Sequence, residues 1–291
     1  MTPLRIVFDT NAFMQGNFEL LEQGPMRKLC HSGRIVPVYS DALIEETLNA
    51  YMIERKRDDL IKRWLPFIVD TAGQKICKLL DSIWHEELVQ GRGLDARIFM
   101  TRRDYERFVE GISSIPMDGS WELWHSSQSE RDIEKKKRAS MREVLGLMRQ
   151  EIADRPKSAG YHSEKYGASN LGIFLESEVD YTGDQLIHSI FKANGPHAIS
   201  GRWSRAKKQY PYFSQFVVNN LYMAYHAMTK SNNALDENAQ VDLDLMTRLL
   251  HADVLVSNEK GFLKCAFNDL WRPQRKVLFT SSEFADFMQK L

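Results

Sequence analysis

The segment that most constrains the fold is Leu4-Arg5-Ile6-Val7-Phe8, an apolar run that leads directly into Asp9, Thr10 and Asn11. Branched and aromatic residues of this kind favour a buried β-strand. The acid, hydroxyl and amide that follow would then lie at the carboxyl end of the strand, which is the edge where ligands bind in an open parallel sheet. The segment therefore predicts an α/β sheet, provided that further strands bring polar residues to the same edge.

Strands and helices are predicted to alternate in both terminal parts of the chain. Short apolar runs predict the strands, and helical periodicity predicts the segments between them. The expected strands are residues 5–9, 34–40, 254–256 and 277–279, with 65–69 as a further short one, and the expected helices are 18–32, a segment capped by Ser40 or Asp41, 241–251 and 282–291. Strands joined by helices form parallel units, so we expect a doubly wound parallel sheet flanked by helices.

The middle of the chain has a different character. Residues 75–230 contain few convincing strands but several amphipathic helical stretches, such as 139–154 and 213–228. Clusters of Gly, Pro and Ser at residues 113–120, 156–160 and 194–201 are typical of loops. We therefore expect residues 1–74 and 231–291 to form one α/β domain, with 75–230 as a large helical insertion.

Composition excludes several classes of protein. Lys plus Arg and Asp plus Glu are equal at 39 each, so no overall basic field marks the chain as a nucleic-acid binder. Cys30, Cys77 and Cys265 are few and lack a CxxC pair, which argues against a disulfide framework and a structural zinc site. No apolar segment approaches the length of a membrane span, and no signal region precedes the first strand. A cytoplasmic protein is expected.

Acidic residues recur where the predicted elements converge. Asp9 ends the first strand, Glu46 lies on the helix after the second, and Asp242 and Asp244 lie at the start of the helix before residues 254–256. Ser257, Asn258 and Glu259 then end that strand. Carboxylates gathered at one edge require a compensating cation, because like charges raise each other's pKa. Oxygen ligands favour Mg2+ or Mn2+, the ions that assist phosphodiester hydrolysis.

These motifs resemble those of the PIN-domain nucleases. Phe8-Asp9-Thr10-Asn11 is similar to the opening Asp-Thr/Ser-Asn motif of that family, and residues 40–48 are similar to its Ser-to-Glu segment. Residues 252–262 resemble the family strand that ends in Val-Thr-x-Asp-x-x-Phe. The resemblance implies a PIN-like fold and a Mg2+- or Mn2+-dependent endoribonuclease acting on RNA. It also implies two kinds of protein partner, a second copy of the chain or an inhibitor protein.

The resemblance also implies the roles of individual residues. Asp9, Glu46 and Asp242 correspond to the metal-binding carboxylates, and Thr10, Asn11 and Ser257 would support them through hydrogen bonds. Asp244 competes with Asp242 for the same role, and Asp242 is favoured by its spacing from Ser257. Asp253 precedes its strand and is expected to make a structural contact instead.

One position departs from the family pattern. Glu259 stands where the family usually has Asp, which moves its carboxylate one methylene further from the backbone. Activity would then survive, be weakened, or depend on Asn258. Two alternatives follow: a catalytically impaired PIN domain that binds RNA or assembles with partners, and a DNA-directed nuclease related to the flap-cleaving branch.

Two basic runs in the insertion are candidates for nucleic-acid contact. Residues 134–138 form one, and the other contains Arg202, Arg205, Lys207 and Lys208, interleaved with Trp203, Tyr210 and Tyr212. Phosphate contacts combined with aromatic stacking hold single-stranded nucleic acid in many proteins. The alternative is a solvated charged surface. The eight histidines show no metal-ligand spacing, and His188 and His197 are expected to be structural.

Overall fold

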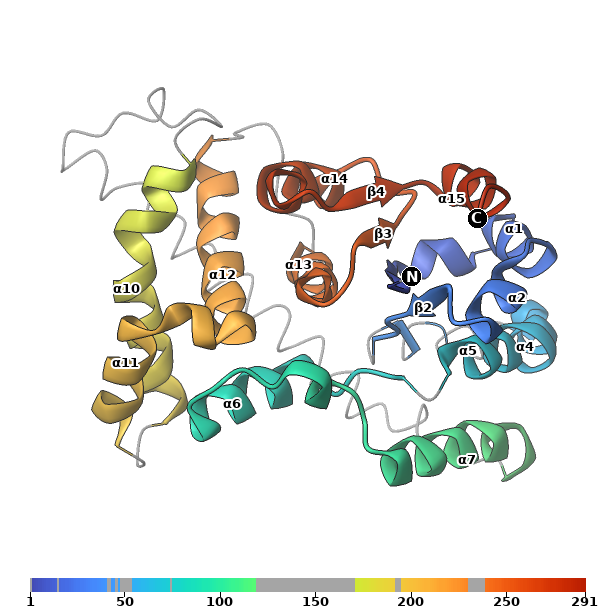
Figure 1. Cartoon of the computed structure of the whole chain (residues 1–291), viewed down its shortest axis with the longest axis horizontal. Coiled ribbons are helices and arrows are strands. Elements are labelled where there is room, and N and C mark those ends of the chain that lie inside the picture. The colour runs from blue at the N-terminus through green and yellow to red at the C-terminus, as the bar shows by residue number, and fades with distance from the viewer. Residues whose placement is uncertain are drawn as a thin grey trace. The chain divides into compact units, whose positions relative to one another are not determined.

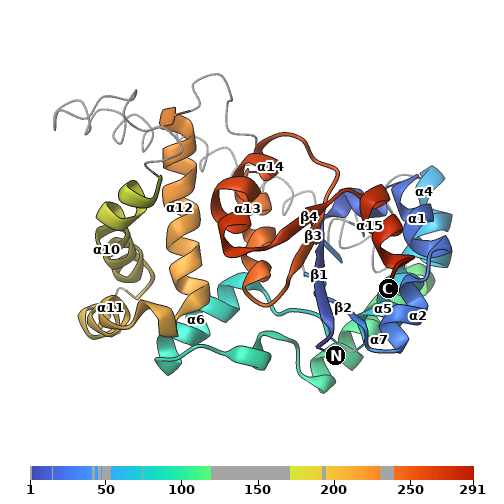
Figure 2. The same cartoon turned by 45° about the horizontal axis from the view of Figure 1, so that its top comes forward.

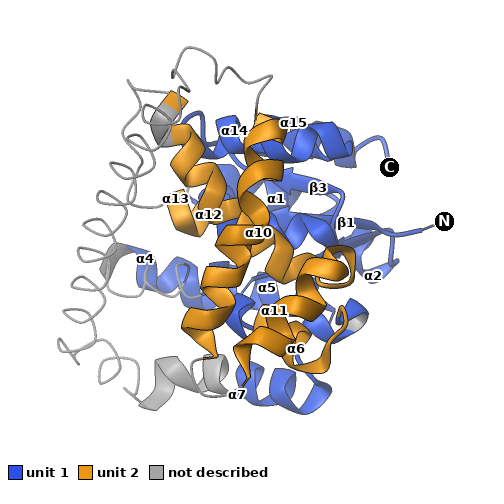
Figure 3. Ribbon diagram, turned by 90° about the vertical axis from the view of Figure 1, so that its left-hand side faces the viewer, with its two compact units in different colours: residues 1–83, 94–118, 243–291 blue, residues 84–93, 119–242 orange. Residues whose placement is uncertain are grey.

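The computed structural model describes residues 2–14, 16–40, 43–44, 47, 54–73, 75–118, 171–191, 195–229 and 239–291 (Figure 1). The chain divides into two compact units, which Figure 3 colours separately. Unit 1 comprises residues 1–83, 94–118 and 243–291, and unit 2 comprises 84–93 and 119–242. Each unit is described by itself below.

Unit 1 is built on a four-stranded sheet in which all strands are parallel. The strands are β1 (Leu4–Phe8), β2 (Ile35–Pro37), β3 (Val254–Val256) and β4 (Val277–Phe279), in the order β2-β1-β3-β4. Ile6 pairs with both Pro37 and Val254, so β1 is central. The expected α/β class, with a parallel sheet flanked by helices and a helical insertion, is confirmed.

Helices cover both faces of this sheet. In Figure 2, α1 (Asn17–Gln23), α2 (Met26–His31) and α15 (Ser281–Met288) lie on one face, and α14 (Phe262–Ala266) lies on the other. The chain therefore leaves β1 toward one face and β3 toward the opposite face. The remaining helical segments of unit 1 include α4 (Glu54–Asp59), the π-helix η3 (Leu60–Trp64), α5 (Leu65–Ala72), η4 (Asp95–Ile98), α7 (Arg102–Asp118), η8 (Arg248–Leu250), the π-helix η9 (Phe267–Trp271) and η10 (Arg272–Gln274). Two helices cross the boundary between the units: α6 (Leu80–Gln90) and α13 (Ala239–Thr247).

Four local predictions were wrong. The strand expected at residues 65–69 is helix α5, because its buried residues Leu65, Ile68 and Ala72 follow helical spacing. The single helix expected at 18–32 is two helices, because the chain breaks at Gly24 and Pro25. Two of the expected loops are largely helical: α7 runs through residues 113–118, and α11 (Pro196–Arg205) starts at a proline in its first turn, where proline is favoured.

Ser40 caps the helix that follows β2, as expected. Its Oγ accepts a hydrogen bond of 2.9 Å from the backbone N–H of Leu43. Leu43, Ile44 and Thr47 are helical and buried, which is the face predicted from their spacing. The predicted segments 139–154 and 156–160 lie outside the described residues.

Aromatic side chains fill the core between the sheet and its first helices. Phe13 packs against three aromatic neighbours, with ring centroids 5.9 Å from Phe8, 6.0 Å from Phe18 and 6.4 Å from Phe67. The Tyr39 hydroxyl is buried and satisfied by Thr71 Oγ1 at 2.7 Å. Aromatic rings thus surround Phe8, the last residue of β1.

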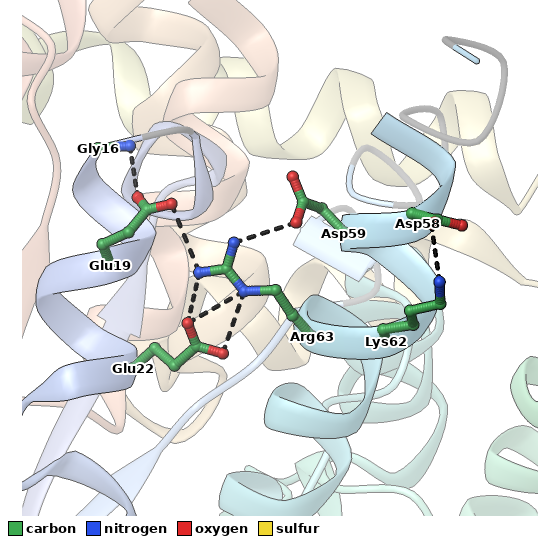
Figure 4. A network of polar contacts seen from close by, with 7 residues as sticks. All are labelled: Gly16, Glu19, Glu22, Asp58, Asp59, Lys62 and Arg63. Atoms are coloured by element: carbon green, nitrogen blue, oxygen red, sulfur yellow. Dashed lines mark hydrogen bonds and ion pairs between the residues drawn. The ribbon is translucent and has the colours of Figure 1, made fainter. Parts of the chain in front are cut away.

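A surface network joins α1 to η3 through Arg63 (Figure 4). The Arg63 guanidinium forms ion pairs with Glu22 and, at 3.0 Å, with Asp59, and it approaches Glu19 at 3.4 Å. These acids raise the pKa of Arg63 further above its usual value, with the Glu22 hydrogen bond as the main cause. Because the network is partly exposed, it orients the two helices more than it stabilises them.

Unit 2 is helical. Besides the end of α6, it contains α10 (Leu171–Ile190), α11, the short 3-10 helix η7 (Lys207–Gln209) and α12 (Pro211–Thr229). The helix expected at 213–228 is thus confirmed as part of α12. Trp203 is fully buried against Gly183, where an added Cβ would lie 2.0 Å from the Trp203 ring. Trp84 of α6 stacks on Phe216 of α12 with centroids 5.1 Å apart.

A buried carboxyl group holds the first turn of α12. Glu87 of α6 is 0% exposed, and its Oε2 accepts hydrogen bonds from the backbone N–H groups of Tyr212, at 2.9 Å, and Phe213, at 3.0 Å. Glu87 Oε1 has no hydrogen-bond partner among the described residues. Burial raises the pKa of Glu87 to about 8, although the two N–H donors act in the opposite direction.

Candidate functional site

The two central strands carry Asp9 and Ser257 to adjacent positions. The Asp9 N–H donates to the carbonyl of Val256 at 3.0 Å, and the Ser257 N–H donates to the carbonyl of Phe279 at 2.9 Å. Both residues therefore extend the strand ladder just beyond its last named pair. Because the chain leaves β1 and β3 toward opposite faces, they lie at the topological switch point where open parallel sheets bind ligands.

Hydrogen bonds tie these residues into one cluster with Asn11. Asp9 Oδ2 accepts from Asn11 Nδ2 and from Ser257 Oγ, each at 2.6 Å. Asn11 Nδ2 also lies 3.3 Å from Ser257 Oγ, and Ser257 Oγ accepts from the backbone N–H of Glu259 at 3.1 Å. The Asp9 carboxylate is thus fixed by two side-chain donors that come from different strand ends.

Asn258 links this cluster to the next strand end. Its backbone N–H donates to Asn11 Oδ1 at 3.0 Å. Its side-chain amide donates to Ser281 Oγ at 2.7 Å and accepts from the Ser281 N–H at 3.1 Å. Because both side-chain polar atoms of Asn258 have partners, its role is to position the loop after β3.

Sequence reasoning missed Ser281, which is fully buried at the start of α15. The rule that singled out Asp9 and Ser257, a polar residue after an apolar strand, applies equally to the residues after β4. The sequence analysis also did not identify Asn17, whose Nδ2 donates a hydrogen bond to the Asn11 carbonyl at 2.8 Å.

The electrostatics of the cluster centre on Asp9. Burial raises the pKa of Asp9, while hydrogen bonds from Ser257 and from the backbone and side chain of the Thr10-Asn11 segment act to lower it. A nearby cation would stabilise the ionised form of such a carboxylate. The side-chain oxygens of Asp9, Asn11 and Ser257 are of the kind that bind Mg2+ or Mn2+. Within the described ranges, however, no group of three or more His, Cys, Asp or Glu residues is placed to hold a metal ion.

The other predicted acids are placed as follows. Asp242 is buried in the first turn of α13 and belongs to unit 2. Asp244 is half-buried and belongs to unit 1, and its backbone carbonyl accepts a hydrogen bond from Arg248 Nη1 at 2.9 Å. Glu259 is half-buried, and its carboxylate lies against Gly261, where an added Cβ would be 2.8 Å from Oε1. Glu46 lies outside the described residues. Asp253 makes the expected structural contact, accepting from the Arg5 N–H at 3.3 Å.

The basic run of unit 2 differs from its expected arrangement. Trp203 and Tyr212 are fully buried and Tyr210 is 3% exposed, so these rings pack in the core and are not exposed for stacking on bases. Lys207 pairs with Asp180 at 2.7 Å. The side chains of Arg202, Arg205 and Lys208 are exposed on α11 and η7. The other basic run, at residues 134–138, lies outside the described part of the chain.

Comparison with protein-family models, curated protein sequences and solved structures finds no match to the chain. Within the described residues, no helix has both the length and the apolar character needed to cross a membrane.

Proposed function

We propose that the chain is a metal-dependent endoribonuclease of PIN-like character, which hydrolyses RNA phosphodiester bonds at the Asp9 cluster. The observation that carries this proposal is the placement of Asp9, Asn11 and Ser257 at the switch point of a parallel sheet, joined by short hydrogen bonds. The polar triplet after β1 and the Ser-Asn pair after β3 are the same residues on which the resemblance to PIN-domain nucleases rests.

Each residue of the cluster has a role in this proposal. Asp9 would bind Mg2+ or Mn2+, and Asn11 and Ser257 would hold its carboxylate in one orientation. The resemblance to PIN-domain nucleases assigns Glu46 and Asp242 as further metal-binding carboxylates, with Thr10, Asp244 and Glu259 in support. When bound, the ion would supply an activated water and stabilise the leaving oxygen. The exposed Arg202, Arg205 and Lys208, with Lys207, would contact the RNA backbone.

The test compares the wild-type protein with Asp9→Asn. This change removes the ionisable group and keeps the shape of the side chain. Calorimetric titration with MnCl2 and MgCl2 should show binding that the variant loses, and a fluorescent single-stranded RNA should be cleaved only by the wild type. Because a neutral amide removes the cost of burying a charge, the variant should remain folded by circular dichroism.

Asp286→Asn provides a matched control, since Asp286 is exposed on α15. It should bind metal and cleave RNA as the wild type does. Full metal-dependent cleavage by Asp9→Asn would refute the proposed role of Asp9.

A second candidate is a PIN-like module that binds RNA without cleaving it. The position of the Glu259 carboxylate beside Gly261 favours this candidate, because the fourth acid then lies next to its own loop. In the same assay, RNA that is bound by the wild type but left intact with both metals would support this candidate. Parallel reactions with single-stranded DNA and a branched duplex test for a flap-type nuclease.

A further inference from the structure

Two histidines that are nine positions apart in the sequence meet on the surface of unit 2. His188 lies near the end of α10, and His197 lies in the first turn of α11. His188 Nε2 and His197 Nδ1 are 3.1 Å apart, and the ring centroids are 4.5 Å apart with the ring planes at 69°. His197 is exposed, so solvent reaches the pair.

The packing of α10 on α11 fixes this arrangement. The Trp203 ring lies directly on Gly183, a contact that only a residue without a side chain allows. One turn away, Ser200 Oγ donates a hydrogen bond to Asp184 Oδ1. His188 follows Asp184 by four residues, and His197 precedes Ser200 by three, so the next turn of each helix brings the two imidazoles together.

The surroundings of His188 determine which of its nitrogens carries a lone pair. His188 Nδ1 lies 2.9 Å from the backbone carbonyl of Asp184, and 3.4 Å from Asp184 Oδ1. A carbonyl and a carboxylate oxygen only accept hydrogen bonds, so Nδ1 carries the proton in neutral His188. The lone pair of neutral His188 is therefore on Nε2, the atom that faces His197.

We propose that His188 Nε2 and His197 Nδ1 form a binding site for a transition-metal ion, with Zn2+ as the best match. Two nitrogens bound tetrahedrally to Zn2+ at its usual bond length lie about 3.3 Å apart, close to the 3.1 Å found here. Imidazole suits Zn2+, Cu2+ and Ni2+. The contact of His188 Nδ1 with Asp184 is the outer-shell hydrogen bond that metal-bound histidines typically make.

This site is distinct in chemistry from the Asp9 cluster and does not rest on the proposed nuclease function. It uses nitrogen ligands, whereas the Asp9 cluster offers oxygen donors suited to Mg2+ or Mn2+. Two imidazoles are the protein ligands, and solvent completes the coordination of the ion. In the metal-free protein, His197 donates its Nδ1 proton to His188 Nε2, and metal binding moves that proton to Nε2 of His197.

The experiment titrates ZnCl2 into the full chain by calorimetry, in a buffer that binds zinc weakly. The proteins compared are the wild type, His188→Gln, His197→Gln and the control His31→Gln. His31 is exposed and contacts Asp70 at 2.9 Å, so the control removes a histidine that also has a carboxylate partner. Because loss of an outer-shell partner alone weakens metal binding tenfold to a hundredfold, each ligand variant should lose at least about tenfold in affinity.

The wild type and His31→Gln should bind Zn2+ equally, and the nitrogen resonances of both imidazoles should shift on binding. Equal binding by all four proteins, or no zinc binding by the wild type, would overturn the proposal. If His188→Gln fails to fold, the comparison rests on His197→Gln, because His197 is exposed and can be replaced without a cavity.

Discussion

Replacing Glu87 by Gln should change how the stability of the protein depends on pH. Glu87 is fully buried, and burial raises its pKa from 4.5 to about 8. The folded state therefore holds the Glu87 proton at pH values where the unfolded chain has released it. The contribution of Glu87 to stability is therefore full below pH 4.5, falls as the pH rises from 4.5 to 8, and no longer changes above that range.

The size of this effect follows from the pKa. Each unit of difference corresponds to about 1.4 kcal/mol, so the fall between pH 5 and pH 9 is about 4 kcal/mol. The positive end of the α12 dipole favours the ionised form by up to about 2 kcal/mol, which gives an expected range of about 2 to 4 kcal/mol. Gln keeps an oxygen that can accept from the N–H groups of Tyr212 and Phe213 but has no charge. Glu87→Gln should therefore lose this part of the pH dependence.

Urea unfolding at pH 5, 7 and 9, followed by tryptophan fluorescence, measures the difference in unfolding free energy between wild type and variant. Glu87→Gln should gain stability relative to the wild type by about 2 to 4 kcal/mol from pH 5 to pH 9. Glu176→Gln, an exposed residue of α10, is the matched control and should show no such gain. A change below about 1 kcal/mol for Glu87→Gln would show that the carboxyl group is ionised in the folded protein at neutral pH.

Further substitutions test the contact of Trp203 with Gly183 and the cap of helix α15. Gly183→Ala should destabilise the protein by about 1 to 3 kcal/mol in urea unfolding, because the new Cβ collides with Trp203. Gly172→Ala, in the same helix with nothing within 4 Å, should be neutral or stabilising by up to about 1 kcal/mol, and equal effects at both positions would contradict the argument. Thr280→Ala should lower stability by about 1 kcal/mol, measured in the same way, because Thr280 caps α15 in a reciprocal pair with Glu283. An unchanged free energy of unfolding would indicate that this cap contributes nothing.

The sheet could be predicted from the sequence because its strands are short, apolar and bounded by polar residues. The predictions for β3 and β4 match residue for residue, and the first strand differs by one position at each end. The prediction of a strand at residues 65–69 was wrong because a short run rich in branched residues fits a strand and a buried helix equally well. In the structure, the buried residues of this segment follow helical spacing, and the segment is helix α5.

The candidate site was predictable only in part, for a related reason. Asp9 and Ser257 come together because parallel strands end at a common edge, which the alternation of strands and helices along the chain already implies. The meeting of His188 with His197 depends on how far one helix slides along another. That register is set by the Trp203 ring on Gly183, a contact between positions that no local pattern relates.

The central place of β1 determines when the sheet can be completed during synthesis. Asp9 and Ser257, which extend the β1–β3 ladder, are 248 residues apart. Closing a loop of that length costs about 5 kcal/mol of chain entropy, against about 3 kcal/mol for the pairing of β1 with β2. On the ribosome, the edge of β1 that pairs with β3 must therefore stay without this partner until residues 254–256 have emerged. Early folding of the intervening helices would shorten the loop between β1 and β3. It would also reduce the time during which the edge of β1 can pair with other nascent chains.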